Sequence, residues 1–203
     1  MIALDPFYPV VPDSMWVARL VSAGTRLVQL RVKDRTDAEL HRQVREARDA
    51  CARHGAQLIV NDHWRVAIAE ACDFVHLGQE DLLDADIAAL RRAGIRIGVS
   101  THDHAELDKG LAIDPDYVAL GPIWPTQLKK MPWAPQGLAR IAEWKRLIGD
   151  RPLVAIGGLT LDRALQCLAA GADVAAVVGD VVNHADPIGQ ATAWIAATRG
   201  TAA

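Results

Sequence analysis

The stretch Val28-Gln29-Leu30-Arg31-Val32-Lys33 carries the pattern that recurs through the whole chain. A short run with β-strand character ends in polar residues, and a helical pattern follows it. The same succession returns in LIVND at 58–62, FVHLGQED at 74–81, IRIGVSTH at 95–102, YVALGPIWPTQLKK at 117–130, LVAIGG at 153–158 and VAAVVGD at 174–180. Such apolar runs are typical of parallel strands buried on both faces, whose carboxyl ends gather ligand-binding residues in α/β proteins.

Eight strand–helix pairs can be counted along the 203 residues. The expected strands are 7–11, 27–31, 57–61, 74–77, 95–99, 117–120, 153–156 and 174–178. The expected helices are 14–23, 36–54, 64–71, 84–93, 104–111, 137–148, 160–170 and 187–198. Ser14 and Thr36 are the expected N-caps of the first two helices, with Glu39 completing a capping box. An open doubly wound sheet usually has five or six strands, so eight pairs predict an α/β fold of the (β/α)₈ TIM-barrel type, one domain over 1–203.

Composition limits the class of partner. The formal net charge is −3 with a pI near 6.1, and Lys and Arg do not cluster, so we expect neither nucleic-acid nor membrane binding. Cys51, Cys72 and Cys167 are widely spaced and lack metal-ligand spacing, which favours reduced packing residues. No signal-peptide pattern or long apolar window is present, so a cytoplasmic protein is expected. The sequence leaves open whether the chain forms a homo-oligomer.

In the opening stretch, Gln29, Arg31 and Lys33 fall on one face of an extended chain, and the apolar residues between them fall on the other. An edge strand with a solvated face would explain this alternation equally well. In a closed barrel surrounded by helices, however, the polar row must point inward near the mouth. Buried cations need an anion or paired carboxylates, and a phosphate or diphosphate would satisfy them.

Acidic residues follow the next two strands. Asp62 and Asp81, each of which alone is more often a helix cap or surface charge, would meet beside the cationic row if the strands are neighbours. Together they could hold Mg²⁺, which prefers one or two carboxylates and fills its remaining positions with water and phosphate oxygens. His76 and His102 have no metal-ligand spacing, and we interpret both as packed or hydrogen-bonded side chains.

Glycines follow the last two predicted strands, at Gly157-Gly158 and Gly179. Most glycines at strand ends are turn residues. In many barrels, however, the loops after strands seven and eight bind a phosphate through backbone N–H groups and a helix N-terminus. With the cationic row near strand two, this pattern suggests two phosphate-binding places and therefore two phosphorylated substrates.

Taken in order, the motifs QLRVK, ND, HLGQED, GVSTH, GPIWPTQLKK and AIGG resemble those of the thiamine phosphate synthase family over nearly the whole chain. The resemblance implies an alkyl-group transferase of thiamine biosynthesis that joins hydroxymethylpyrimidine diphosphate to a thiazole phosphate, with Mg²⁺, and releases pyrophosphate. It implies that the pyrimidine diphosphate contacts Gln29, Arg31, Lys33, Asn61, Ser100 and Lys129, and that Leu30 and Val32 also belong to the substrate-binding residues. It implies thiazole phosphate contacts at Thr126, Gly158, Val178 and Gly179, with the metal at Asp62 and Asp81. The catalytic residues would be Arg31, Lys33, Ser100 and Lys129.

Two positions depart from the family pattern. The loop after strand six usually reads Thr-x-Thr-Lys, and here Leu128 replaces the second hydroxyl, while Gly179 stands where serine is common. Each lost hydrogen bond to a charged phosphate would cost about ten- to a hundredfold in affinity. Three alternatives remain at this point: a thiazole-isomerising relative, another barrel acting on a sugar phosphate, and a catalytically silent phosphate-binding module. The first uses a histidine near strand six, where this chain has Gly121-Pro122-Ile123.

Overall fold

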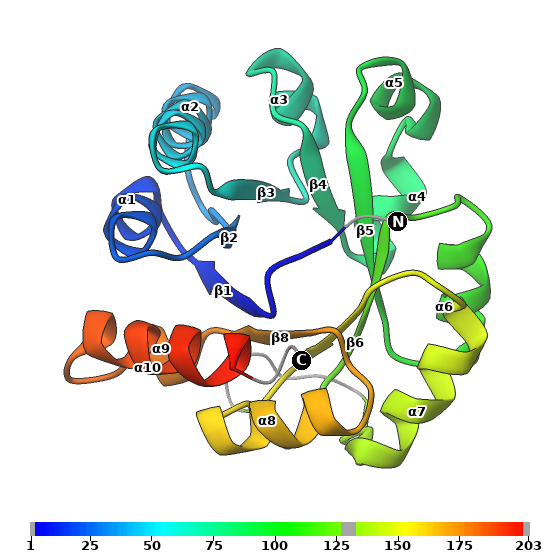
Figure 1. Cartoon of the computed structure of the whole chain (residues 1–203). Helices are drawn as coiled ribbons and strands as arrows, with labels where there is room; N and C mark the ends of the chain where they lie inside the picture. The colour runs from blue at the N-terminus through cyan, green and yellow to red at the C-terminus, as the bar shows by residue number, and fades with distance from the viewer. Residues whose placement is uncertain (1–2, 127–132, 201–203) are drawn as a thin grey trace.

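Eight parallel strands form a closed barrel at the centre of the structure (Figure 1). The computed structural model describes residues 3–126 and 133–200. The strands are β1 (Phe7–Val11), β2 (Leu27–Leu30), β3 (Gln57–Asn61), β4 (Phe74–Leu77), β5 (Arg96–Thr101), β6 (Tyr117–Leu120), β7 (Leu153–Ile156) and β8 (Val174–Val177). Each strand pairs with the next, and β8 pairs with β1 to close the ring. The TIM-barrel prediction is therefore confirmed.

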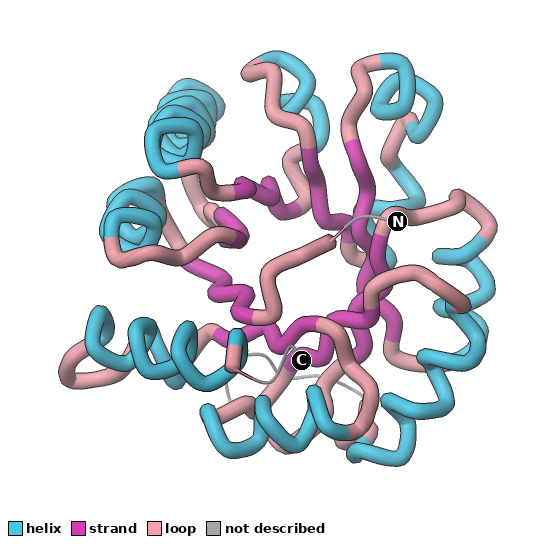
Figure 2. The backbone as a smooth tube through the Cα atoms, viewed as in Figure 1, coloured by secondary structure: helices cyan, strands magenta, loops and turns pink. Residues whose placement is uncertain are grey.

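Helices surround the barrel and cover the outer face of its strands (Figure 2). They are α1 (Ser14–Ser22), α2 (Asp37–His54), α3 (Trp64–Ala69), α4 (Gln79–Asp84), α5 (Ile87–Arg92), α6 (His104–Leu111), α7 (Gly137–Ile148), α8 (Leu161–Ala169), α9 (Gly179–Val182) and α10 (Pro187–Arg199). Within the described part of the chain, none of these helices combines the length and apolar character needed to cross a membrane.

The helix caps agree only in part with the sequence analysis. Asp13, not Ser14, caps α1 and accepts a hydrogen bond from the backbone N–H of Trp16 at 2.9 Å. Both residue types cap helices well, so the sequence could not separate two adjacent candidates. Thr36 caps α2 as predicted, with the N–H of Glu39 donating to its hydroxyl at 3.3 Å. The Glu39 carboxylate binds an arginine three residues on instead of closing the expected capping box.

Several element boundaries near the site differ from the predictions. Instead of one helix over 84–93, α4 begins at Gln79 and α5 begins after Asp86, which caps it through the N–H of Ala89 at 2.8 Å. The strand β5 runs two residues beyond the predicted end, so Ser100 lies within it. The short helix α9, which was not predicted, begins at Gly179. As a result, three predicted site residues lie in helices or strands: Asp81 in α4, Ser100 in β5 and Gly179 in α9.

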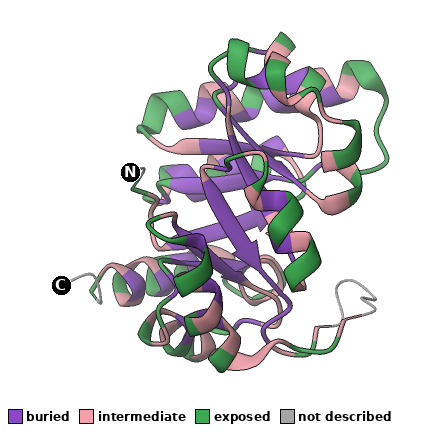
Figure 3. Ribbon diagram, turned by 90° about the vertical axis from the view of Figure 1, so that its right-hand side faces the viewer, coloured by how far each residue is buried: buried purple, intermediate pink, exposed green. Residues whose placement is uncertain are grey.

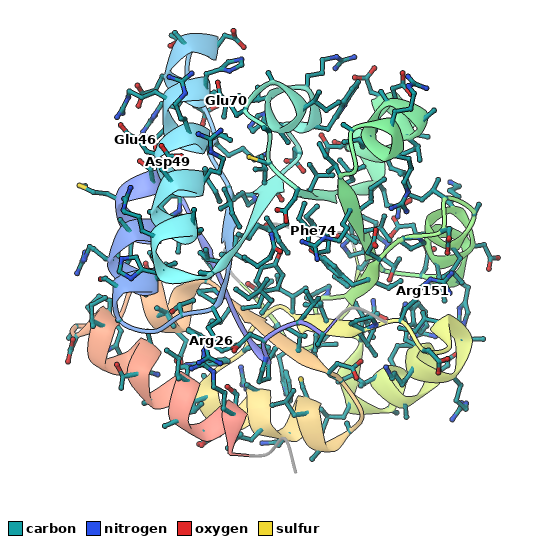
Figure 4. The ribbon with its side chains drawn as sticks, turned by 45° about the horizontal axis from the view of Figure 1, so that its top comes forward. Arg26, Glu46, Asp49, Glu70, Phe74 and Arg151 are labelled. Carbon is teal, nitrogen blue, oxygen red and sulfur yellow. The ribbon has the colours of Figure 1, made fainter. Side chains whose placement is uncertain are left out.

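The barrel has an interior and an exterior core, and the strands are buried between them (Figure 3). Alternate strand residues point inward, so Leu27 belongs to the interior cluster while Val28 packs outward against the helices. Phe74 occupies the centre of the ring (Figure 4). The interior cluster consists of Tyr8, Leu27, Ile59, Phe74, Tyr117, Ala119, Val154, Val174 and Ala176. The three free cysteines are buried, which confirms that they are packing residues.

Candidate active site

Polar side chains replace apolar ones inside the barrel toward the carboxyl ends of the strands. Gln29 and Asn61 occupy the inward positions that follow Leu27 and Ile59, and only 5% of each remains exposed. Ser100 takes the corresponding position on β5 and is partly buried. The amide nitrogen of Asn61 has no hydrogen-bond partner among the described residues although it is buried. A buried amide donor left unpaired is costly, which indicates that this end of the barrel is built to receive an acceptor from a ligand.

An ion pair lies at the rim directly above this polar interior. The Nζ atom of Lys33 lies 2.7 Å from Oδ2 of Asp62. Asp62 has a left-handed backbone, with φ of 61°, and its N–H donates to the carbonyl of His76 at 2.9 Å, which continues the pairing of β3 with β4. Burial opposes ionisation of Asp62, but the hydrogen bond and charge of Lys33 outweigh it and keep the pKa of the carboxyl low.

A second carboxylate lies beside Asp62. Asp81, in the first turn of α4, is within hydrogen-bonding reach of Asp62, and burial together with the charge of Asp62 raises its pKa. With Lys33, both carboxylates line a cleft of about 470 Å³ between α2, α3 and α4. Two neighbouring carboxylates repel each other when both are ionised, and a divalent cation bound between them would remove this repulsion.

The acidic pair is small for a metal centre made of protein ligands alone. Within residues 3–126 and 133–200, no three His, Cys, Asp or Glu side chains gather around one point. Zinc sites normally need three or four protein ligands, whereas Mg²⁺ commonly takes one or two carboxylates and completes its shell with water and phosphate oxygens. The donor set at Asp62 and Asp81 therefore fits Mg²⁺ and does not fit a structural zinc.

The cationic residues after β2 lie at the rim but are not buried as the sequence predicts. The strand ends at Leu30 rather than at Arg31, and the side chains of Arg31 and Lys33 are exposed, with 46% of the Lys33 side chain accessible. The prediction that they are buried is wrong, because water reaches both side chains at the rim. The backbone N–H of Arg31 still donates to the carbonyl of Val11 at 2.8 Å. Leu30 and Val32 pack outward among the helices, so only their backbone can contact a ligand.

The glycines after β7 and β8 also come together. Ile156 pairs with Ala176, so Gly158 and Val178 follow on adjacent strands, and Gly179 begins α9. Gly158 has φ of 67°, and a Cβ atom there would lie 2.6 Å from the carbonyl oxygen of Pro125. Only glycine therefore allows the loop after β6 to approach this turn.

Part of the predicted site falls in the loop after β6. Thr126 is half-buried and is the last residue described before the segment 127–132, so Lys129 and Leu128 lie outside the described residues. The two tryptophans that flank the segment both have neighbours. Trp124 lies under the guanidinium of Arg163, 5.4 Å from the ring centroid, and Trp133 stacks on His102 with centroids 4.0 Å apart. These contacts join the described ends of the loop, at Trp124 and Trp133, to α8 and to the turn after β5.

His76 was interpreted from the sequence as a packed or hydrogen-bonded histidine, and the structure confirms this. Its ring is buried inside the barrel, where Nδ1 lies 2.7 Å from the hydroxyl of Tyr117 and Nε2 lies 2.8 Å from Oγ of Ser100. Burial lowers the pKa of His76 to about 4, so the ring is neutral near pH 7. Its contact with Ser100 was missed, although strand alternation from Phe74 would have placed the ring inside. His102 bonds Glu106 at 2.6 Å.

Comparison with known proteins identifies the family. Residues 8–181 match the family model described as thiamine monophosphate synthase. The chain belongs to this family. A thiamine-phosphate synthase of Rhizobium etli is 57% identical over 195 residues, which cover 96% of each chain. One from Cronobacter sakazakii is 51% identical over 88% of this chain and 85% of its own.

A solved structure shares the fold. The thiamine phosphate pyrophosphorylase from Pyrococcus furiosus superposes with a TM-score of 0.84, covers 98% of both chains and is 24% identical. The resemblance inferred from the six motifs is therefore confirmed by family model, by close relatives and by architecture. These matches do not favour the isomerising or catalytically silent alternatives.

Proposed function

We propose that this chain is a thiamine-phosphate synthase, an alkyl-group transferase that joins hydroxymethylpyrimidine diphosphate to a thiazole phosphate and releases pyrophosphate. Family membership and relatives that share about half or more of its sequence support this activity. The structural observation that supports it most is the unpaired, buried amide of Asn61 beside the carboxylates of Asp62 and Asp81. These groups place a hydrogen-bonding pocket next to a charged rim. A substrate that has both an aromatic ring and a diphosphate requires this combination.

In this proposal the pyrimidine ring enters the barrel and its diphosphate stays at the rim. The polar interior offers Gln29, Asn61 and Ser100 to the ring and to the first phosphate. The exposed position of Arg31 and Lys33 suits them to a diphosphate that arrives from solvent, because its charge can be met without burying unpaired cations first. Lys129, from the loop after β6, would add a third positive charge.

Asp62 and Asp81 would hold Mg²⁺, which supplies charge neutralisation to the diphosphate when it is bound. Lys33 has two roles in this arrangement. It keeps Asp62 ionised and therefore able to act as a ligand, and its exposed ammonium group would also bind the diphosphate. The left-handed backbone at Asp62 fixes the direction in which the carboxylate faces.

The chemistry requires the bond between the pyrimidine methylene carbon and the diphosphate oxygen to break. The oxygen keeps the bonding electrons, and the electron-rich aminopyrimidine stabilises the remaining cation. Arg31, Lys33 and Lys129 stabilise the negative charge that develops on the leaving group. The thiazole nitrogen then donates its lone pair to the methylene carbon, and the new carbon–nitrogen bond completes thiamine phosphate. No protein nucleophile is needed, so positioning and charge account for catalysis.

The thiazole phosphate would bind at the turns after β7 and β8. Gly158, Val178 and Gly179 offer backbone N–H groups there, and Thr126 approaches from the loop after β6. Because Gly179 and Leu128 lack the hydroxyls common in the family, we expect weaker affinity for the thiazole phosphate than a relative with both hydroxyls would have.

The purified chain, incubated with both substrates and Mg²⁺, tests this proposal. We expect thiamine phosphate and pyrophosphate in equal amounts, and no thiamine phosphate when the thiazole phosphate is omitted. The Asn61→Ala variant should lose activity while its thermal unfolding stays close to that of the wild type. Absence of both products from the folded wild-type chain would refute the proposal.

The partners in this proposal are the two phosphorylated substrates, with neither nucleic acid nor membrane involved. A cytoplasmic location is part of the proposal and is supported by three cysteines that are all free.

A further inference from the structure

A continuous chain of hydrogen bonds crosses the interior of the barrel and joins two of the predicted substrate contacts. It begins at Gln29 on β2 and ends at Ser100 on β5, and three buried side chains link them. The successive distances are 2.7 Å from Gln29 Nε2 to the Tyr8 hydroxyl, 3.1 Å from Tyr8 to the Tyr117 hydroxyl, 2.7 Å from Tyr117 to His76 Nδ1 and 2.8 Å from His76 Nε2 to Ser100 Oγ.

The direction of this chain is taken from Gln29, whose Nε2 donates to the Tyr8 hydroxyl. In that direction the Tyr8 hydroxyl accepts from Gln29 and donates its own hydrogen to the Tyr117 hydroxyl. Tyr117 in turn donates to Nδ1 of His76. A neutral imidazole that accepts at one nitrogen donates from the other, so Nε2–H donates to Ser100. The hydroxyl proton of Ser100 is then left to point toward the mouth of the barrel.

Packing holds the central members of this chain in place. The rings of His76 and Tyr117 stack with centroids 5.6 Å apart and an interplanar angle of 14°, and Tyr8 meets Tyr117 edge-on at 6.3 Å. Gly98 on β5 makes room for the Tyr117 ring, because a Cβ atom there would lie 2.1 Å from it. The hydroxyl and imidazole groups therefore have little freedom to turn.

We propose that His76, held in one tautomer by Tyr117 and Tyr8, is a positioning residue that presents the Ser100 hydroxyl as a hydrogen-bond donor to the pyrimidine diphosphate. This inference rests on the proposed function. Both ring nitrogens of His76 are committed inside the protein, so the residue acts through Ser100 and does not contact the substrate. A neutral donor of fixed direction at the reacting end adds to the stabilisation supplied by the cations at the rim.

A double-mutant cycle tests this role. We expect His76→Phe and Ser100→Ala each to lower kcat by about ten- to a hundredfold, since loss of orientation at a reacting centre costs this much. If His76 acts through Ser100, the double variant stays within about threefold of Ser100→Ala. Multiplicative losses in the double variant would overturn the inference. His76→Gln, which retains an N–H donor near the position of Nε2, should recover activity relative to His76→Phe.

A matched control separates positioning from stability. Thr101, next to Ser100 on β5, donates to the carbonyl of Ala119 at 2.9 Å and accepts from Trp144 at 2.9 Å, all outside the interior chain. Thr101→Val removes buried hydrogen bonds from the same strand, so it should lower the Tm with kcat unchanged. An equal loss of kcat in Thr101→Val would overturn the positioning role.

Two further measurements keep the inference testable if His76→Phe does not fold. Tyr117→Phe removes one oxygen atom and should lower kcat in the wild-type background but not in the Ser100→Ala background. Nuclear magnetic resonance of the ¹⁵N-labelled imidazole should place the proton of His76 on Nε2, and a proton on Nδ1 would contradict the direction of the chain. A wild-type chain that makes no thiamine phosphate refutes the proposed function, whereas an active wild type with additive variants refutes only this inference.

Discussion

The Lys33→Ala variant separates the function of the rim from its contribution to stability. The side chains of the Lys33–Asp62 pair are 46% and 15% exposed. Because solvent screens such a pair, it contributes only about 0.2–1 kcal/mol to the free energy of folding. The effect on catalysis should be larger. A cation about 4 Å from a phosphate charge contributes about 4 kcal/mol at an effective dielectric near 20, and we halve this for the exposure of Lys33. The remaining value of about 2 kcal/mol corresponds to about thirtyfold in rate.

The assay is pyrophosphate release at saturating concentrations of both substrates with Mg²⁺, paired with urea unfolding of the same samples. Lys145→Ala is the matched control, because Lys145 binds Asp173 at 2.6 Å with side chains that are 32% and 43% exposed. Asp173 directly precedes β8, so the Lys145–Asp173 pair lies at the amino-terminal end of the barrel, away from the site. Both variants should lose similar stability, and only Lys33→Ala should lose turnover. A Lys33→Ala enzyme within threefold of wild type, or an equal loss in Lys145→Ala, would refute the role given to Lys33.

Three other expectations concern acid stability, packing and the loop after β6. The bond from Arg45 lowers the pKa of Glu70, between α2 and α3 (Figure 4), to about 2, below its ordinary 4.5. Its contribution to stability is therefore complete above pH 4.5 and is lost as the pH falls toward 2, and unfolding of Glu70→Gln should depend less on pH over that window. Gly98→Ala should destabilise the fold by about 1–3 kcal/mol in urea, because the new methyl group overlaps the Tyr117 ring; an unchanged midpoint would contradict that packing. Lys129→Ala should slow pyrophosphate release by about a hundred- to a thousandfold, and a loss below threefold would remove Lys129 from catalysis.

The fold could be predicted because every strand carries its own signal. Period-two alternation puts Gln29 on the face opposite Val28 and Leu30, and the eight strand–helix pairs, which predict a closed barrel, turn that face inward. The exposure of Arg31 could not be predicted, because Arg31 continues the same alternation beyond the end of β2 at Leu30. The expectation of buried cations failed for that reason.

Contacts between distant strands were also beyond the sequence. The partners of His76 are 41 and 24 residues away, and the register of β4 with β5 and of β5 with β6 determines that they meet. The pairing of Lys33 with Asp62 likewise depends on the left-handed turn at Asp62, which a non-glycine residue rarely adopts. Residue types predicted which chemical groups the site contains. The closure of the barrel determined which of them form ion pairs and hydrogen bonds.

Calorimetric titration of inorganic pyrophosphate, with and without Mg²⁺, tests most directly whether the rim accepts the leaving group. We predict binding that strengthens markedly when Mg²⁺ is present, loses that gain in the Asp62→Asn and Asp81→Asn variants, and weakens in Lys33→Ala but not in Lys145→Ala. Pyrophosphate affinity that is indifferent to Mg²⁺ and to all of these substitutions would contradict the account.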